Sequence, residues 1–238
     1  TSFQKLLPYP LTKAQQRVIS EIYQDMNGDQ PMMRLVQGDV GSGKTAVAAA
    51  AIAKCCLNGK QAAMMAPTEL LAAQHYHNLA PLLEQLQISV ALLTSSTPAK
   101  EKKNILTGLA DGSINFAVGT HALIQEGVIF ADLGLAITDE QHRFGVAQRS
   151  LLAEKGNHPH MLVMSATPIP RTLALIIYGD LDISVLDELP PGRQTIETYA
   201  ISSRKRARAL QYIRTHLDAG QQAYIICPLV EESTNDMA

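Results

Sequence analysis

Short runs rich in strand-forming residues, most of them apolar, alternate along the chain with longer stretches in which apolar and polar residues recur at helical spacing. The short runs are residues 34–37, 62–66, 90–93, 116–118, 133–138 and 161–165. The longer stretches are residues 12–26, 44–57, 69–86, 99–110, 146–154 and 171–177. This alternation is typical of βαβ units, and strands that are apolar nearly throughout are buried on both faces. We therefore predict an α/β fold in which helices flank a mainly parallel sheet.

A proline-rich segment interrupts this rhythm. Residues 189–193 read Leu-Pro-Pro-Gly-Arg, and paired prolines stiffen the chain and prevent a helix. After this segment the chain offers a strand-like run (195–201), a helix-like stretch (205–217) and another strand-like run (222–229). Two strands and one helix are too few to close a sheet core. We predict a domain over residues 1–188, a linker over 189–194 and the truncated start of a second α/β lobe over 195–238.

Composition restricts the class of protein but does not identify a function. With 238 residues and 46% hydrophobic content, the chain can bury one substantial core. Its formal net charge of −2 gives no global attraction to nucleic acid, so any such contact must be local. No apolar run is long enough to cross a bilayer, and the adjacent Cys55 and Cys56 argue against a disulfide framework. We expect a cytoplasmic protein without a membrane partner.

A phosphate-binding motif lies between the first predicted strand and the helix that follows it. The motif, G-x-x-x-x-G-K-[ST], consists of Gly38, Asp39, Val40, Gly41, Ser42, Gly43, Lys44 and Thr45. Its glycines let backbone N–H groups surround phosphate oxygens, Lys44 reaches the β and γ phosphates, and the Thr45 hydroxyl ligates Mg²⁺. The predicted cofactors are ATP and Mg²⁺. An ordinary glycine-rich turn is the alternative, which the flanking strand and helix disfavour.

An acidic pair follows the buried run 133–138. Ligands of α/β proteins bind beyond the carboxyl ends of the strands, where Asp139 and Glu140 are expected. Asp139 can hold Mg²⁺, and Glu140 can orient and deprotonate the attacking water. Alone, such a pair is more often a solvated turn. The phosphate-binding motif favours the catalytic interpretation.

The string Asp139-Glu140-Gln141-His142, together with the phosphate-binding motif, resembles the nucleotide site of superfamily 2 helicases and translocases. The resemblance implies a RecA-like P-loop fold and adds Gln141 and His142 to the catalytic set. Leu-Thr-Lys-Ala-Gln, ending at Gln15, resembles the motif that reads adenine, with Gln16 as an alternative in register. Ser165, Ala166 and Thr167 resemble the motif that couples the ATP state to lobe movement.

Two further motifs of the superfamily imply DNA contacts at predicted strand ends. Their residues are Pro67, Thr68 and Glu69 in the first motif and Gly119, Thr120 and His121 in the second. Small hydroxyls and exposed backbone N–H groups suit phosphate contacts that are independent of base sequence. Helix capping by Thr68 and Thr120 is the structural alternative, and one residue can fulfil both roles. His75 and His77 lie two residues apart and face different sides of a helix, so no zinc site is indicated.

Within the superfamily, four strings resemble the RecG family of bacterial helicases, which remodel branched DNA and stalled forks. These strings are LVQGDVGSGKT, DEQHRFGV, ATPIPRT and DELPPGR. The resemblance implies a monomer whose ATP site is completed by arginines of a second lobe beyond position 238, and a wedge domain that precedes Thr1. Two alternatives remain: a double-strand translocase of the transcription-repair coupling type, which usually has glutamate in place of Gln141, or a regulatory nucleotide-binding module.

Overall fold

The computed structural model describes residues 6–7, 9–139, 151–166, 181–188 and 197–226. The chain divides into two compact units, Thr1–Arg193 and Gln194–Ala238. The predicted linker 189–194 lies outside the described residues, as does the predicted helix 171–177. Of the predicted helix 146–154, residues 151–153 are helical and 146–150 are not described.

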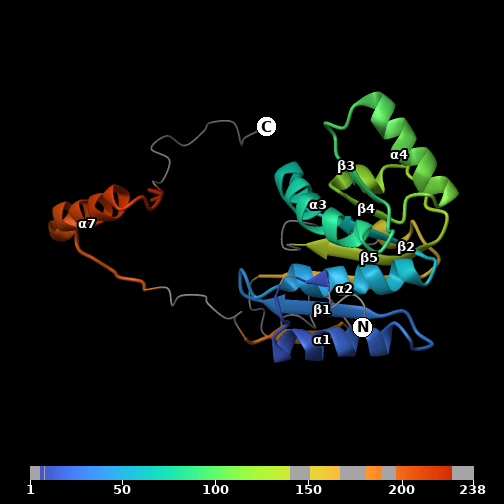
Figure 1. Cartoon of the computed structure of the whole chain (residues 1–238), viewed down its shortest axis with the longest axis horizontal. Coiled ribbons are helices and arrows are strands. Elements are labelled where there is room, and N and C mark those ends of the chain that lie inside the picture. The colour runs from blue at the N-terminus through green and yellow to red at the C-terminus, as the bar shows by residue number, and fades with distance from the viewer. Residues whose placement is uncertain (1–5, 8, 140–150, 167–180, 189–196, 227–238) are drawn as a thin grey trace, which may run out of the picture. The chain divides into compact units, whose positions relative to one another are not determined.

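The first unit is built on a seven-stranded sheet in the order β3-β4-β2-β5-β6-β1-β7. Figure 1 labels β1 to β5 of this sheet. The strands are β1 (Met33–Gly38), β2 (Gln61–Met65), β3 (Val90–Leu93), β4 (Phe116–Gly119), β5 (Leu133–Asp139), β6 (His160–Ser165) and β7 (Asp182–Leu186). All described strand pairs are parallel. This arrangement confirms the predicted α/β class and RecA-like sheet.

Helices cover both faces of the sheet. They are α1 (Lys13–Asp25), α2 (Lys44–Leu57), α3 (Glu69–Glu84) and α4 (Ala99–Asp111), with a short 3-10 helix η2 (His121–Ile124). Apolar residues of α1, α2 and α3 pack in one core cluster with one face of the strands, whereas α4 and η2 contribute to a second cluster on the other face. Alternate residues of β2 enter different clusters: Met64 packs in the first and Met65 in the second. Both faces of this strand are therefore buried, as its apolar sequence predicted.

Local sequence signals explain where these helices begin and end. The Thr12 side chain accepts a hydrogen bond from the Gln15 N–H, and the Gln15 side chain bonds back to the Thr12 N–H, which forms a capping box at the start of α1. Pro98 precedes α4, and Gly112 ends it with a φ of 81°, a left-handed conformation that glycine adopts without strain.

Strand β7 is the one element of the described sheet that the hydrophobic pattern did not predict. It lies at the edge of the sheet, where it pairs only with β1. Its residues Asp182 and Val185 are exposed, so the segment lacks the continuous apolar run that marked the central strands. Its five residues include the charged Asp182 and the polar Ser184, whereas β3, at the opposite edge, has the apolar run that predicted it.

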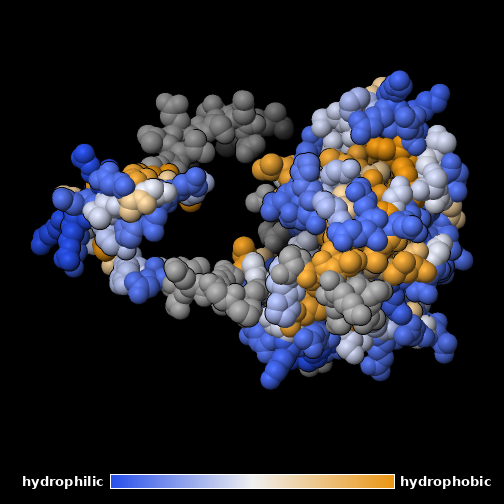
Figure 2. Space-filling model, in the orientation of Figure 1, coloured by the Kyte–Doolittle hydropathy of each residue, from blue (hydrophilic) through white to orange (hydrophobic). Residues whose placement is uncertain are grey.

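The described part of the second unit contains a short 3-10 helix η4 (Ser203–Lys205) and the helix α7 (Arg206–Asp218), which corresponds to the predicted helix 205–217. The predicted flanking strands are not formed in residues 197–201 or 222–226. A strand requires a hydrogen-bonding partner, and the described residues of this unit include none. No described residue of α7 is buried, and apolar side chains lie on the surface of this unit (Figure 2).

No helix within the described ranges is both long and apolar enough to span a membrane. The longest apolar run of the sequence, Ala46 to Ala53, is the buried middle of α2.

Candidate functional site

The loop from Gly38 to Thr45 joins the end of β1 to the start of α2. Gly41 and Gly43 have φ angles of 79° and 88°, in the left-handed region. Lys44 Nζ donates hydrogen bonds to the carbonyl oxygens of Gly38 (2.6 Å) and Asp39 (3.1 Å). The ammonium group is thus folded back over the loop that a phosphate group would enter.

Gly43 also meets a steric requirement. A Cβ added there would lie 2.1 Å from Nε2 of Gln15, a contact that real Cβ atoms essentially never make. The positive φ favours glycine at this position, and a side chain here would also have to displace the Gln15 amide. The loop therefore has little freedom to accept another residue at its junction with α2.

Gln15 connects the start of α1 to this loop. Its side chain is 1% exposed; Oε1 accepts from the Thr12 N–H (2.9 Å) and Nε2 donates to the Ser42 carbonyl (2.9 Å). Gln16, the alternative in register, is exposed and donates to the Leu11 carbonyl. The structure thus places Gln15, and not Gln16, against the phosphate-binding loop.

A cleft of about 540 Å³ opens beside Gln15. It is lined by Tyr9, Pro10, Gln15, Gly41, Gly43, Lys44 and Thr45. The Tyr9 ring, 50% exposed, offers an apolar face next to the Gln15 amide. The sequence reasoning missed Tyr9. An aromatic residue just upstream of the predicted adenine-reading glutamine is the signal that could have found it.

Asp139 ends β5 and lies beside a second cleft of about 460 Å³. This cleft is lined by Val40, Gly41, Lys44, Thr45, Pro67, Leu71, Gln74, His75, Asn78, Asp139, Met164 and Ala166. The structure therefore brings Lys44, Thr45 and Asp139 together. Glu140, Gln141 and His142 lie outside the described residues.

The donor set at this cleft fits Mg²⁺. A hydroxyl from Thr45 and a carboxylate from Asp139 are hard oxygen ligands, and Mg²⁺ is usually held by one or two protein groups together with phosphates and water. Within the described residues there is no group of three or more His, Cys, Asp or Glu side chains that could hold a metal ion. A Mg²⁺ site with two protein ligands, completed by the phosphates of a nucleotide, agrees with both observations.

The Asp139 carboxylate has a partner that the sequence reasoning missed. His75 Nε2 on α3 lies 2.6 Å from Asp139 Oδ2. The helix start at Thr68 and the periodicity of α3 were predictable, but nothing in the sequence pairs two residues 64 positions apart.

Three loops meet at the carboxyl edge of β2, β3 and β4. Pro67, Thr68 and Glu69 follow β2, and Gly119, Thr120 and His121 end or follow β4. The loop after β3 contacts both of these loops. Ser96 donates from its N–H (3.1 Å) and its hydroxyl (2.8 Å) to the Glu69 carboxylate. Ser95 Oγ lies 3.4 Å from His121 Nε2. This third loop was also missed, and its signal was the hydroxyl-rich run Thr94-Ser95-Ser96-Thr97.

Helix capping, the structural alternative to DNA contact, applies to one of the two threonines in these loops and not to the other. Thr68 is exposed and its side chain accepts a hydrogen bond from the Leu71 N–H at 3.3 Å, so it does cap α3. Thr120 precedes η2 but makes no side-chain capping bond. Its hydroxyl is buried and has no hydrogen-bond partner among the described residues. The capping alternative is therefore wrong for the Thr120 side chain.

The predicted coupling motif begins at the end of β6. Ser165 is buried, and Ala166 lines the same cleft as Asp139. Thr167 lies outside the described residues.

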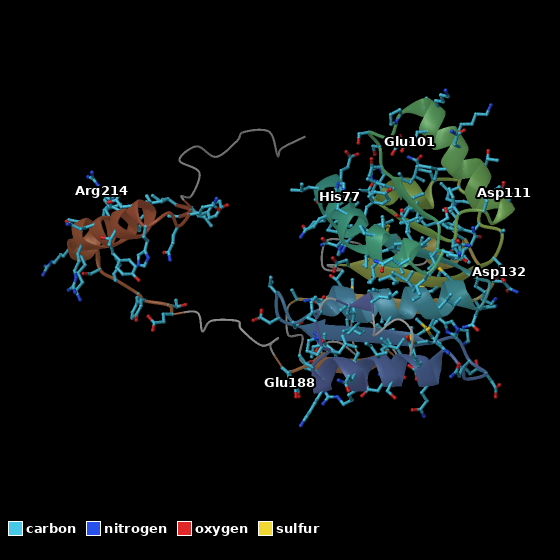
Figure 3. All side chains as sticks on the ribbon, viewed as in Figure 1. His77, Glu101, Asp111, Asp132, Glu188 and Arg214 are labelled. Atoms are coloured by element: carbon cyan, nitrogen blue, oxygen red, sulfur yellow. The ribbon has the colours of Figure 1, made fainter. Side chains whose placement is uncertain are left out.

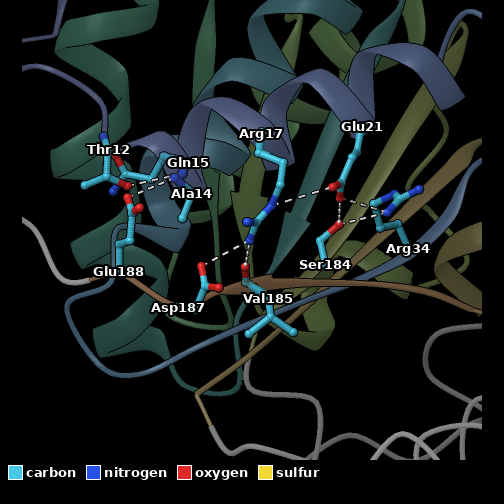
Figure 4. Close-up of polar contacts among 10 residues, drawn as sticks. All are labelled: Thr12, Ala14, Gln15, Arg17, Glu21, Arg34, Ser184, Val185, Asp187 and Glu188. Atoms are coloured by element: carbon cyan, nitrogen blue, oxygen red, sulfur yellow. Dashed lines mark hydrogen bonds and ion pairs between the residues drawn. The ribbon is translucent and has the colours of Figure 1, made fainter.

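A polar network fastens β7 to α1 near this site (Figure 4). Glu188, just after β7, accepts a hydrogen bond at 3.0 Å from the backbone N–H of Ala14, next to Gln15. Arg17 donates to the Val185 carbonyl (2.7 Å) and to Asp187 (3.1 Å). A hydrogen bond from the backbone N–H of Asp187 lowers the pKa of its own carboxyl group, and the hydrogen bond from Arg17 lowers it further. The segment before residue 189 is thus attached to the helix that carries Gln15.

The cysteines of α2 take no part in this site. Cys55 and Cys56 are buried free thiols. Burial raises the pKa of Cys55 to about 12 and also raises the pKa of Cys56. Both therefore remain protonated near neutral pH, where they act as small apolar residues.

The parallel sheet, the phosphate-binding loop after β1 and the carboxylate after β5 define a P-loop nucleotide-binding domain of the helicase type. Residues 12–176 match the family model described as DEAD/DEAH box helicase, and the chain belongs to this family. Membership implies use of a nucleotide.

Relatives with about half of their aligned residues identical are named ATP-dependent DNA helicase RecG. The protein of Bacillus subtilis is 56% identical over 231 residues, which cover 97% of this chain and 34% of that protein. The protein of Aquifex aeolicus is 52% identical over 229 residues, which cover 95% of this chain and 29% of that protein. The resemblance to RecG is confirmed. The chain spans about a third of the length of these relatives.

Solved structures agree with this result. A structure of RecG bound to a three-way DNA junction matches with a TM-score of 0.85 and 47% identity, over 96% of this chain and 31% of that one. A DEAD box protein from Methanococcus jannaschii matches with a TM-score of 0.58 and 22% identity, over 85% of this chain and 56% of that one. The second likeness shows the fold alone.

Proposed function

We propose that the chain is the ATP-binding motor lobe of a RecG-like DNA helicase that acts on branched DNA in the bacterial cytoplasm. The observation that carries this proposal is the cleft shared by Lys44, Thr45 and Asp139. These groups come from β1–α2 and β5, and together they offer a cation for phosphate and oxygen ligands for Mg²⁺. The solved RecG bound to a DNA junction supports the choice of DNA as partner.

Within this proposal the described residues hold the nucleotide in two places. On nucleotide binding, the Lys44 ammonium would exchange the carbonyl oxygens of Gly38 and Asp39 for phosphate oxygens, which bind it more strongly because they are charged. The Gln15 amide and the Tyr9 ring border the cleft where a base would lie, and an aromatic face suits stacking on a purine. Thr45 and Asp139 would hold Mg²⁺, which would neutralise charge on the phosphates.

Hydrolysis requires residues beyond those described. We assign Glu140 as the base that activates water, and Gln141 and His142 as contacts between the nucleotide and a facing lobe. Ser165 to Thr167 then couple the nucleotide state to lobe movement. Ala166 supports this assignment, because it lines the cleft that contains Asp139.

DNA is proposed to contact the three loops at the edge of β2, β3 and β4. These loops present the exposed Thr68 and Ser95 hydroxyls and the exposed His121 ring. Hydroxyls and backbone N–H groups bind phosphates without reading base sequence. A second lobe and a wedge domain of the same polypeptide, outside residues 1–238, are proposed to complete the ATP site and to recognise the branch, in a protein that acts as a monomer.

Replacing Lys44 with alanine tests the nucleotide site. We expect Lys44→Ala to weaken binding of a fluorescent ATP analogue in Mg²⁺ about a hundredfold, because hydrogen bonds to charged groups contribute about 1.5–3 kcal/mol each. Equilibrium fluorescence titration measures the change. Lys54→Ala is the matched control, since Lys54 lies in the last turn of the same helix and bonds Asn27. Equal affinities of Lys44→Ala and the parent would refute the proposed site.

A further inference from the structure

His75 is a buried histidine whose ring contacts the carboxylate proposed to bind Mg²⁺. Its Nε2 lies 2.6 Å from Asp139 Oδ2, and the two side chains are only 10% and 11% exposed. At this distance Nε2–H donates a charge-assisted hydrogen bond to the carboxylate. Water competes little for a contact so well buried, so the bond restricts rotation of the Asp139 side chain.

The rest of the His75 environment gives no structural reason for a histidine. Among the described residues, its Nδ1 has no hydrogen-bond partner, and the atom is buried. A buried polar atom without a partner costs about 1–3 kcal/mol. Its neighbours on the inner side of α3, such as Ala72, Leu79 and Leu83, are apolar. An apolar residue would fill this position at lower cost, so the contact with Asp139 is what distinguishes histidine here.

The fold explains how a residue of α3 reaches the end of β5. Strand β2 pairs with β5 in register up to Met65 and Thr138, and three residues after Met65 the chain reaches Thr68, the cap of α3. Two turns into α3, His75 borders the same cleft as Thr45 and Asp139. A carboxylate has two oxygens. A hydrogen bond at Oδ2 leaves the other oxygen able to accept a cation.

We propose that His75 is a positioning residue for the metal site: its Nε2–H holds the Asp139 carboxylate in the orientation that binds Mg²⁺ beside Thr45. This inference rests on the proposed function, in which Thr45 and Asp139 hold the Mg²⁺ of a bound nucleotide. Outer-shell hydrogen bonds to metal ligands typically contribute about 10–100-fold to metal affinity or activity. In this proposal His75 acts through the Asp139 carboxylate and is not itself a metal ligand.

A comparison of nucleotide affinity with and without Mg²⁺ distinguishes a metal-positioning role of His75 from a packing role. In the 238-residue chain, the dissociation constant of a fluorescent ATP analogue is measured in Mg²⁺ and in EDTA. We expect His75→Leu to weaken binding in Mg²⁺ about tenfold and to leave binding in EDTA unchanged. His77→Leu is the matched control, because His77 is exposed on the same helix (Figure 3), and it should match the parent in both buffers.

Two conservative variants and a double variant sharpen the test. His75→Gln places an amide N–H near the position of Nε2 and should restore most of the metal-dependent affinity. His75→Asn is too short to do so and should behave like His75→Leu. On an Asp139→Asn background, His75→Leu should cause no further loss, since the two residues act through one contact.

Several outcomes would overturn the proposal. Unchanged affinity of His75→Leu in Mg²⁺ would do so, and so would equal losses in Mg²⁺ and EDTA, which indicate a packing role. If His75→Leu does not fold, the nucleotide affinities of His75→Gln and His75→Asn are compared instead. Equal affinities of these two variants in Mg²⁺ would contradict a role for the Nε2–H. A parent chain that binds no more tightly in Mg²⁺ than in EDTA refutes the proposed metal site itself, a failure visible before any variant is made.

Discussion

His160, at the start of β6, shows how one half-buried contact makes stability depend on pH. Its Nδ1 accepts a hydrogen bond from the Met32 N–H at 2.9 Å, which only the neutral ring can do. Burial lowers the His160 pKa, and the nearby Lys60 and Lys54 lower it further, below the ordinary value of 6.5. The unfolded chain therefore takes up the proton more readily than the folded one.

The sign of the effect follows from this lowered pKa. The contribution of His160 to the free energy of unfolding is fully present above pH 6.5 and is lost as the pH falls through the unfolded and then the folded pKa. We expect His160→Asn, which keeps an acceptor but does not titrate, to lose less stability than the parent between pH 7.5 and 5.5. Urea unfolding at the two pH values measures the difference.

The neighbouring His158 provides the control for this experiment. It is exposed and has a φ of 55°, a conformation that asparagine tolerates well. His158→Asn should keep the pH dependence of the parent. If His160→Asn loses as much stability as the parent does on acidification, the titrating group lies elsewhere.

Arg34 links three elements of the fold: β1, on which it lies, α1 and β7. Its guanidinium contacts Asp25 (2.6 Å) and Glu21 (3.3 Å) of α1 and donates to Ser184 Oγ of β7 (2.8 Å). Ser184 in turn donates to Glu21. The Arg34 side chain is 10% exposed, whereas that of Glu21 is 35% exposed. One buried cation therefore joins the edge strand to the helix that precedes the phosphate-binding loop.

Removing this cation should loosen the edge of the sheet. We expect Arg34→Met to lower the free energy of unfolding by about 3 kcal/mol, the lower end for a broken buried pair, because Glu21 keeps contact with water. Arg17→Ala is the comparison: Arg17 also joins α1 to β7 but is 51% exposed, so its loss should cost less than about 1 kcal/mol. Denaturant unfolding measures both. Equal effects would contradict the special role of burial.

The same elements show how far the sequence alone predicts this structure. Six of the seven described strands and the helices α1 to α4 were predictable, because the strands carry apolar runs and the helix ends carry turn and capping residues. Strand β7 was not, since the polar residues Asp182 and Ser184 interrupt its apolar pattern. The phosphate-binding loop was recognisable because its chemistry is contiguous in sequence. The contacts of Gln15 with Ser42 and of His75 with Asp139 arise from tertiary packing, which no local pattern encodes.

At the scale of the whole molecule, the 238-residue chain covers about a third of the RecG relatives. We expect it to bind ATP but to hydrolyse it slowly, with little stimulation by forked DNA. The proposed arginines of a second lobe lie outside the chain, and supplying such an arginine typically accelerates hydrolysis about 10³- to 10⁵-fold. Phosphate release is measured with and without forked DNA, and nucleotide binding in the same sample serves as the control. Robust turnover stimulated by the fork would show that these residues complete the site themselves.

The strand order has a consequence for how a change at the proposed nucleotide site would reach the rest of the sheet. Strand β6 lies between β1, which leads to Lys44, and β5, which ends at Asp139. Ser165 and Ala166 therefore end the strand that is flanked by both loops of the proposed phosphate and Mg²⁺ site, and Ala166 lines the cleft that contains Lys44 and Asp139. A movement of either loop would act on the end of β6, which makes β6 the strand of the described sheet best placed to transmit a change of nucleotide state.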